Sequence, residues 1–257
     1  MSEPANDDTK PAITPGSSDA RVVVVTGASR GIGYAVAKAF GAAGAHVIAL
    51  ARTSGALEEL DDAIQSAGGS ATLVPVDLKD HDAIDRMGLA LYERFGRVDV
   101  LVGNAGVLGT ITPLSHIKPK DFDTLVSVNI TANYRLIRSM DPLLRASPAG
   151  RAVFLTSGMA HQAKPFWSGY AMSKAALDAM VATYASEMEN TSVRVNLLNP
   201  GPVRTALRAK AIPGEDPSTL PMPDSVVEHV MRLTDVSFSQ TGMVLNVPTN
   251  ALVSATP

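Results

Sequence analysis

A tyrosine and a lysine that could act together in proton transfer stand four residues apart in the stretch "SGYAMSKAALDAMV", residues 168–181. Residues four apart in an α-helix share a face, so Tyr170 and Lys174 can meet if this stretch is helical. A free tyrosine has a pKa of about 10, too high for a general base near neutral pH, and a neighbouring ammonium lowers that pKa by stabilising the phenolate. The spacing alone is compatible with a proton-transfer pair and with an ordinary helix surface.

A glycine-rich turn, "TGASRGIG" at residues 26–33, directly follows the valine-rich stretch "RVVVVT". Small residues in such a turn let the backbone approach a pyrophosphate, whose charge is stabilised by the N–H groups and dipole at the start of the next helix. No Gly-Lys-Ser/Thr follows, which excludes a nucleoside-triphosphate loop. The pattern predicts a dinucleotide-binding turn, with a βα turn that binds nothing as the alternative. The candidate residues are Gly27, Ser29, Arg30, Gly31, Ile32 and Gly33.

The end of the second expected strand favours NADP(H) over NAD(H). A dinucleotide fold that selects NAD usually places an acidic residue there to bind the ribose 2′-hydroxyl. Here the chain reads "ALARTSG", residues 49–55, and the first acid is Glu58. Arg52, with Thr53 beside it, can hold a 2′-phosphate, and Arg30 can add a second cation. A solvated loop arginine is the alternative reading of Arg52.

Short β-branched stretches alternate with longer helical patterns from residue 21 onward. This alternation implies right-handed βαβ crossovers and a parallel sheet covered on both faces. We therefore expect an α/β, doubly wound, Rossmann-type fold of three layers with about seven strands. Its strands are expected at 21–26, 46–51, 70–77, 98–106, 151–157, 192–201 and 242–247, and its helices at 31–44, 55–68, 81–96, 121–146, 169–189 and 225–234.

The domain organisation predicted is a disordered acidic tail at residues 1–20 followed by one catalytic domain at 21–257. The tail holds four acidic residues and one lysine, and the rest of the chain is electrically balanced. The helix at 121–146 is expected to stop or bend near Pro142. The proline-rich segment 202–224 is expected to be a mobile loop with at most a short helix.

Composition narrows the functional classes. The chain has no cysteine, which excludes disulfides, thiolate metal sites and a cysteine nucleophile, and its five histidines lack the spacing of a helical zinc site. The balanced charge gives no basic excess for nucleic acid, and no apolar run is long enough to span a bilayer. We expect a cytoplasmic protein without metal, nucleic-acid partner or membrane partner.

Further short motifs follow in a fixed order: "VDL", "NAG", "VNI", "LTS" and "NPGPVRT". Ser157, the last residue of "LTS", precedes Tyr170 by 13 residues. In order and spacing, from residue 21 to about 247, the chain resembles the short-chain dehydrogenase/reductase family, of the compact single-domain type. The combination is far more specific than any one motif.

This resemblance implies an NADP(H)-preferring enzyme that interconverts a carbonyl and an alcohol by hydride transfer. Tyr170 matches the general acid/base, and Lys174 matches the lysine that lowers its pKa and binds the nicotinamide ribose. Ser157 matches the hydroxyl that hydrogen-bonds the substrate oxygen. Asn129 matches the asparagine that holds a water beside the lysine in a proton relay. A cofactor-binding role is implied for Asp77, Leu78, Asn104, Ala105, Gly106, Pro200, Gly201, Val203 and Thr205.

Several alternatives stay open. A regulatory or scaffold protein of the same fold that binds cofactor without turnover is one, although an intact serine, tyrosine and lysine argue against it. An enoyl reductase is disfavoured because those relatives usually space tyrosine and lysine by seven. A homo-oligomer is expected, but the last strand lacks the glycine pair common at a family subunit contact. Residues that line the pocket or belong to the core are Met159, Phe166 and Trp167. We interpret His161 as a loop histidine. The sequence does not specify the substrate.

Overall fold

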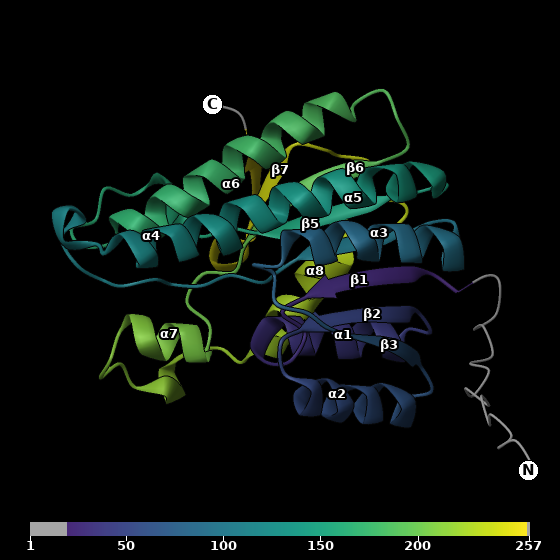
Figure 1. The fold of residues 1–257 in the computed structure, drawn as a ribbon, viewed down its shortest axis with the longest axis horizontal. Coiled ribbons are helices and arrows are strands. Elements are labelled where there is room, and N and C mark those ends of the chain that lie inside the picture. The colour runs from purple at the N-terminus through teal and green to yellow at the C-terminus, as the bar shows by residue number, and fades with distance from the viewer. Residues whose placement is uncertain (1–19, 256–257) are drawn as a thin grey trace, which may run out of the picture.

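The computed structural model describes residues 20–255, so the predicted tail lies outside the described residues except for residue 20. Eight strands form a single sheet in the order β3-β2-β1-β4-β5-β6-β7-β8. All neighbouring strands pair in parallel except β7 and β8, which are antiparallel. The expected doubly wound fold is confirmed (Figure 1). The strands are β1 (Val22–Thr26), β2 (His46–Ala51), β3 (Ser70–Pro75), β4 (Val100–Gly103), β5 (Arg151–Leu155), β6 (Arg194–Asn199), β7 (Met243–Asn246) and β8 (Ala251–Ser254).

The eighth strand was not predicted. A one-turn 3-10 helix, Val247–Thr249, and Asn250 with φ 50° reverse the chain after β7. Asparagine is one of the few residues that tolerate this left-handed conformation, so the turn is tight enough for β8 to pair back onto β7. Only four residues long, β8 gives too weak a pattern for prediction from sequence.

Helices cover both faces of the sheet (Figure 1). One face carries α3, α5 and α6, and the other carries α1, α2 and α8, each contributing side chains to a separate hydrophobic cluster. The central strands are buried along their whole length, as a sheet with two covered faces requires. The helices are α1 (Gly31–Ala42), α2 (Ser54–Ser66), α3 (His81–Phe95), α4 (Pro119–Leu125), α5 (Ala132–Ala146), α6 (Ser168–Glu187), α7 (Ala206–Ala211) and α8 (Val227–Thr234).

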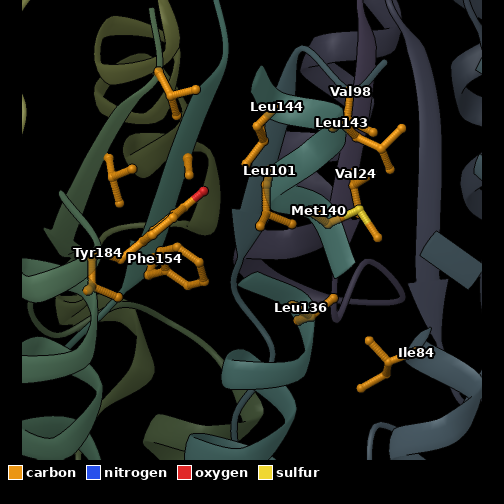
Figure 2. Close-up of a cluster of buried hydrophobic side chains, with 14 of the residues drawn as sticks. Val24, Ile84, Val98, Leu101, Leu136, Met140, Leu143, Leu144, Phe154 and Tyr184 are labelled. Atoms are coloured by element: carbon orange, nitrogen blue, oxygen red, sulfur yellow. The ribbon is translucent and has the colours of Figure 1, made fainter. Parts of the chain in front are cut away.

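The core under α5 shows how one face is held together (Figure 2). Met140 of α5 lies beside Val24 of β1, and Tyr184 of α6 lies beside Phe154 of β5 (Figure 2). Each fully buried side chain of this size contributes about 1.5–3 kcal/mol relative to an exposed one. This packing fixes α5 and α6 on the sheet and thereby sets the position of the first turn of α6.

The helix expected at 121–146 forms, but it is not regular. Between α4 and α5 the chain forms a π-helical segment, Val126–Thr131, so the helical run is continuous from Pro119 to Ala146. It does not stop at Pro142, which lies inside α5. Pro142 is exposed, so water can satisfy the carbonyl that loses its N–H donor.

The segment 202–224 contains the short helix α7 and two 3-10 turns, Pro217–Thr219 and Pro223–Val226. This agrees with the prediction of a loop with at most a short helix. In Figure 1, α7 projects beyond the helix layers. Within residues 20–255, every helix is too short or too polar to cross a membrane.

Candidate active site

Ser157 and Tyr170 come together at the carboxyl end of β5. Tyr170 lies in the first turn of α6, and Ser157 follows β5 in an extended conformation with its hydroxyl accepting a hydrogen bond from the Met159 N–H at 3.2 Å. A hydrogen bond between the two hydroxyl groups lowers the pKa of Tyr170. The fold therefore joins two residues that are 13 positions apart in sequence.

Lys174 lies one helical turn after Tyr170 and is buried with it. Its Nζ donates a hydrogen bond to the Leu155 carbonyl oxygen at 2.7 Å and lies 6.0 Å from the centre of the Tyr170 ring. Burial lowers the pKa of Lys174 to about 8, against an opposing effect of Asp178. At neutral pH the ammonium form predominates, and a small environmental change alters its charge.

Burial raises the pKa of Tyr170, and the Ser157 hydroxyl opposes that rise. Burial and the Ser157 hydroxyl are the two influences on the Tyr170 pKa, and the expected lowering of this pKa by Lys174 stays a prediction. The consequence of the raised pKa is a protonated phenol near neutral pH. That form can donate a proton.

Asn129 lies fully buried in the π-helical segment and fixes the loop after β4. Its Oδ1 accepts from the Val107 N–H at 2.8 Å, and its Nδ2 donates to the Val107 carbonyl at 2.9 Å and to Ser173 Oγ at 2.9 Å. A Cβ added at Gly106 would lie 3.4 Å from this Oδ1 and 3.7 Å from Lys174 Nζ. Asn129 thus holds the loop against α6 beside Lys174, while the water relay stays a prediction.

Asn104 is hydrogen-bonded to Thr26, the first residue of the glycine-rich turn. Its Nδ2 donates to the Thr26 carbonyl at 2.8 Å, and the N–H groups of Asn104 and Ala105 both donate to Thr26 Oγ1 at 3.0 Å. A Cβ added at Gly33 would lie 2.3 Å from the Gly27 oxygen and 2.5 Å from Asn104 Nδ2. No side chain fits there, so glycine is required at position 33.

The start of α1 fits a pyrophosphate. The residue before the helix, Arg30, makes no side-chain cap to the N–H groups of the first turn. These groups and the helix dipole favour an anion. Gly31 has φ 58°, a conformation that favours glycine, and its missing Cβ leaves the turn close to Thr205. Ser29 and Ile32 lie in the same turn and are half-buried.

The end of β2 presents the residues that the sequence suggested for a 2′-phosphate. Arg52 and Thr53 are exposed directly after the strand, and Arg30 is exposed at the glycine turn. Residues 49–57 contain no acid that would repel a phosphate. After β3, Asp77 accepts from the Lys79 N–H at 3.0 Å and so stabilises its own turn. Leu78 beside it is buried.

The segment after β6 reaches both the glycine turn and the Ser157 loop. Asn199, which sequence reasoning did not single out, accepts hydrogen bonds from the N–H groups of Gly158 at 3.1 Å and Gly201 at 3.2 Å. Thr205 caps α7 by accepting from the Arg208 N–H at 3.2 Å. Asn199 is the first residue of "NPGPVRT", which is the signal that could have identified it. In the same segment Pro200 is half-buried and Val203 is buried.

Apolar side chains surround the Tyr170 ring. The sequence suggested Met159, Phe166 and Trp167 as either pocket or core residues. Met159 and Trp167 belong to the apolar cluster around Tyr170, whereas Phe166 is exposed, with φ 73°. Part of the cluster comes from α7 and the residue after it, which places segment 202–224 over the site. The cluster consists of Leu108, Ile111, Met159, Trp167, Tyr170, Leu207, Ala211 and Ile212.

Known proteins resemble this chain in sequence and in fold. A family model described as short chain dehydrogenase matches residues 21–216. YciK, an uncharacterised oxidoreductase of Escherichia coli K12, is 34% identical over 230 residues, which cover 88% of this chain and 91% of YciK. A short chain dehydrogenase from Shigella flexneri 2a strain 301, solved in complex with NADP, superposes with a TM-score of 0.85 at 33% identity and covers 89% of this chain and 97% of its own. Another, from Escherichia coli CFT073 in complex with NADPH, gives a TM-score of 0.83 at 33% identity, with 88% of this chain and 96% of its own covered.

Proposed function

The chain belongs to the short-chain dehydrogenase family of oxidoreductases, and from this premise we propose that it interconverts a carbonyl and an alcohol by hydride transfer, with NADP(H) preferred. The observation that supports this most is the arrangement of Ser157, Tyr170 and Lys174 at the end of β5. The hydroxyl of Ser157 is next to the phenol of Tyr170, and the ammonium of Lys174 lies 6.0 Å from the centre of that ring.

The nicotinamide cofactor supplies the hydride, and the residues of the chain handle the charge and the proton. Tyr170 donates the proton to the developing alkoxide, and its raised pKa keeps it in the donating form. Ser157 donates a hydrogen bond to the same oxygen as negative charge develops there. Lys174 stabilises that charge with its ammonium and orients the cofactor ribose. Asn129 holds the loop beside Lys174, and its part in a water relay belongs to the same proposal.

The preference for NADP(H) rests on Arg52 and Arg30, which are exposed at the end of β2 and at the glycine turn. Two positive charges and no acid favour a cofactor with an additional phosphate. The NADP and NADPH complexes of two similar structures support this choice. Asp77 and Leu78 are proposed to contact the adenine, and the backbone of residues 104–106 and the segment 200–205 to line the nicotinamide.

The substrate proposed is a ketone or aldehyde with an apolar substituent. Apart from Ser157 and Lys174, Tyr170 packs in a cluster of aliphatic and aromatic side chains that includes residues of α7. A charged substituent would lose its hydration there without gaining a partner. We also propose a cytoplasmic homo-oligomer, on the sequence arguments given above.

A panel of carbonyl compounds tests the proposal. Oxidation of NADPH should be fastest with apolar ketones or aldehydes and at least tenfold slower with carboxylate-bearing analogues of the same size. NADH should replace NADPH poorly. Binding of NADPH without oxidation by any ketone, quinone or aldehyde would favour the alternative of a cofactor-binding regulatory or scaffold protein.

A further inference from the structure

Asp178 is a buried carboxylate that the proposed chemistry does not use. It lies on α6 one turn after Lys174 and two turns after Tyr170, so all three share one face of the helix. The residue is 5% exposed, and among residues 20–255 neither carboxylate oxygen has a hydrogen bond of good geometry, although His161 and Thr156 lie close enough to lower its pKa. Burial of a carboxylate without such bonds is costly, and burial raises the pKa of Asp178. Because this burial is unfavourable for folding, we expect a functional reason for a carboxylate at this position.

The groups that face Asp178 all favour its charged form. The exposed ring of His161, from the 3-10 turn after β5, places Nε2 at 3.1 Å from Oδ2. The Thr156 hydroxyl at the end of β5 and the Lys174 ammonium on α6 also lower the pKa of this carboxylate. Asp178 therefore has a buried cation one turn earlier on its own helix and an exposed imidazole 3.1 Å from its Oδ2.

Lys174 has few other groups to stabilise its charge. Its Nζ donates to the Leu155 carbonyl. The neighbouring side chains are the phenol of Tyr170 and the amide of Asn129, which are both neutral. Among the described residues, Asp178 is the one acidic group whose charge raises the pKa of Lys174. Lys174 and Asp178 do not form a direct ion pair within residues 20–255. Their charges therefore interact through space, and the low polarity of the protein interior strengthens this interaction.

We propose that Asp178 is a positioning residue for the reaction proposed above, and that its buried carboxylate is the counter-ion that keeps the Lys174 ammonium charged inside the protein. A lysine that is fully desolvated without a counter-ion loses its proton at lower pH. The carboxylate thus preserves the cation that the cofactor ribose and the developing alkoxide both need. The catalytic use of this charge coupling rests on the proposed function. The coupling between Asp178 and Lys174 is itself a property of the protein without cofactor or substrate.

The test is a pH titration of Lys174 by NMR, in protein labelled with carbon-13 at the lysine ε-carbon. Lys174→Met identifies the signal by its disappearance. In the parental protein the midpoint is expected at about 8. Asp178→Asn should move the midpoint to lower pH, and Asp178→Glu, which keeps the charge, should return it toward the parental value.

Asp141→Asn is the matched control. Asp141 lies on α5 and accepts a hydrogen bond from Tyr184 of α6 at 2.9 Å, so this variant removes a carboxylate beside the same helix but away from Lys174. Its Lys174 midpoint should equal the parental one. An unshifted midpoint in Asp178→Asn, or an equal shift in Asp141→Asn, would overturn the inference. If Asp178→Asn does not fold, Asp178→Ser replaces it with the same expected direction.

This experiment needs neither cofactor nor substrate. Failure of the carbonyl panel therefore contradicts the proposed function and leaves the titration result standing. Where turnover is measurable, the basic limb of the kcat/KM profile in Asp178→Asn should move to lower pH together with the Lys174 midpoint. A variant that lost activity only through a distorted structure would lower the rate without moving that limb.

Discussion

The Nζ of Lys174 donates a hydrogen bond to the carbonyl oxygen of Leu155, at a distance of 2.7 Å. Leu155 is the last residue of β5, two positions before Ser157. This bond ties the first turns of α6 to the strand end from which Ser157 projects. The ammonium is thereby held at the same strand end as Ser157.

A first prediction concerns the charge of Lys174. Its pKa of about 8 means that the ammonium is lost as the pH rises through that value, far below the usual range of a lysine. The kcat/KM for NADPH, which reports groups of the free enzyme, should therefore fall as the pH rises through about 8. A profile of kcat/KM for NADPH measured between pH 6 and 10 checks this. A profile that stays flat to pH 10 would contradict the role of the ammonium.

A second prediction concerns Arg52. Arg52→Asp should weaken NADPH binding by about tenfold or more, since a hydrogen bond to a charged group contributes about 1.5–3 kcal/mol, while NADH binding should hold or improve. Fluorescence titration of both cofactors measures the change. Arg86→Asp, at an exposed arginine of α3 paired with Asp80, is the control and should leave the ratio unchanged. Tighter parental binding of NADH than of NADPH would refute the phosphate-clamp argument.

A third prediction compares two glycines. Gly33→Ala places a methyl group 2.3 Å from the Gly27 oxygen and should cost about 1–3 kcal/mol of stability together with cofactor affinity. Gly55→Ala meets nothing within 4 Å on α2 and should stabilise by about 0.5–1 kcal/mol. Urea unfolding and NADPH titration of both variants distinguish them. Equal stability of the two would show that the turn is less tightly packed than the structure indicates.

The fold was predictable from the sequence, and the candidate site residues could be named from it, because their signals are local. The valine-rich strands, the glycine turn and the spacing of Ser157, Tyr170 and Lys174 each lie within a short stretch. The contact of His161 with Asp178 was not predictable, because it joins two elements 17 residues apart whose relative position depends on the packed sheet. The π-helical segment around Asn129 likewise leaves no pattern in the sequence. The upward shift of the Tyr170 pKa depends on burial, which no spacing shows.

A fourth prediction concerns stability in acid. His46, the first residue of β2, is buried beside β3, with its ring nitrogens 2.8 Å from Ser70 Oγ and 2.8 Å from Thr72 Oγ1. Burial, assisted by Arg94, lowers the pKa of His46, so the unfolded chain binds its proton more readily than the folded one. The stabilisation is present above the unfolded pKa of about 6.5 and is lost as the pH falls below it.

Thermal unfolding at pH 8 and pH 5 measures this effect. The parental Tm should fall toward pH 5, and His46→Gln should reduce the difference between the two values. His116→Gln, at an exposed histidine, should keep the parental difference. The prediction fails if His46→Gln and the parental protein lose the same Tm between the two conditions.

The central claim is that the Tyr170 hydroxyl transfers the proton, and Tyr170→Phe tests it most directly. NADPH oxidation by the best carbonyl of the panel should fall by about 10²–10⁴-fold, the usual contribution of general acid catalysis, while NADPH binds as before. Tyr184→Phe removes a hydroxyl from the same helix, one that is bonded to Asp141, and should keep the parental rate. If Tyr170→Phe turns over at the rate of the parental protein, the proposed mechanism is wrong.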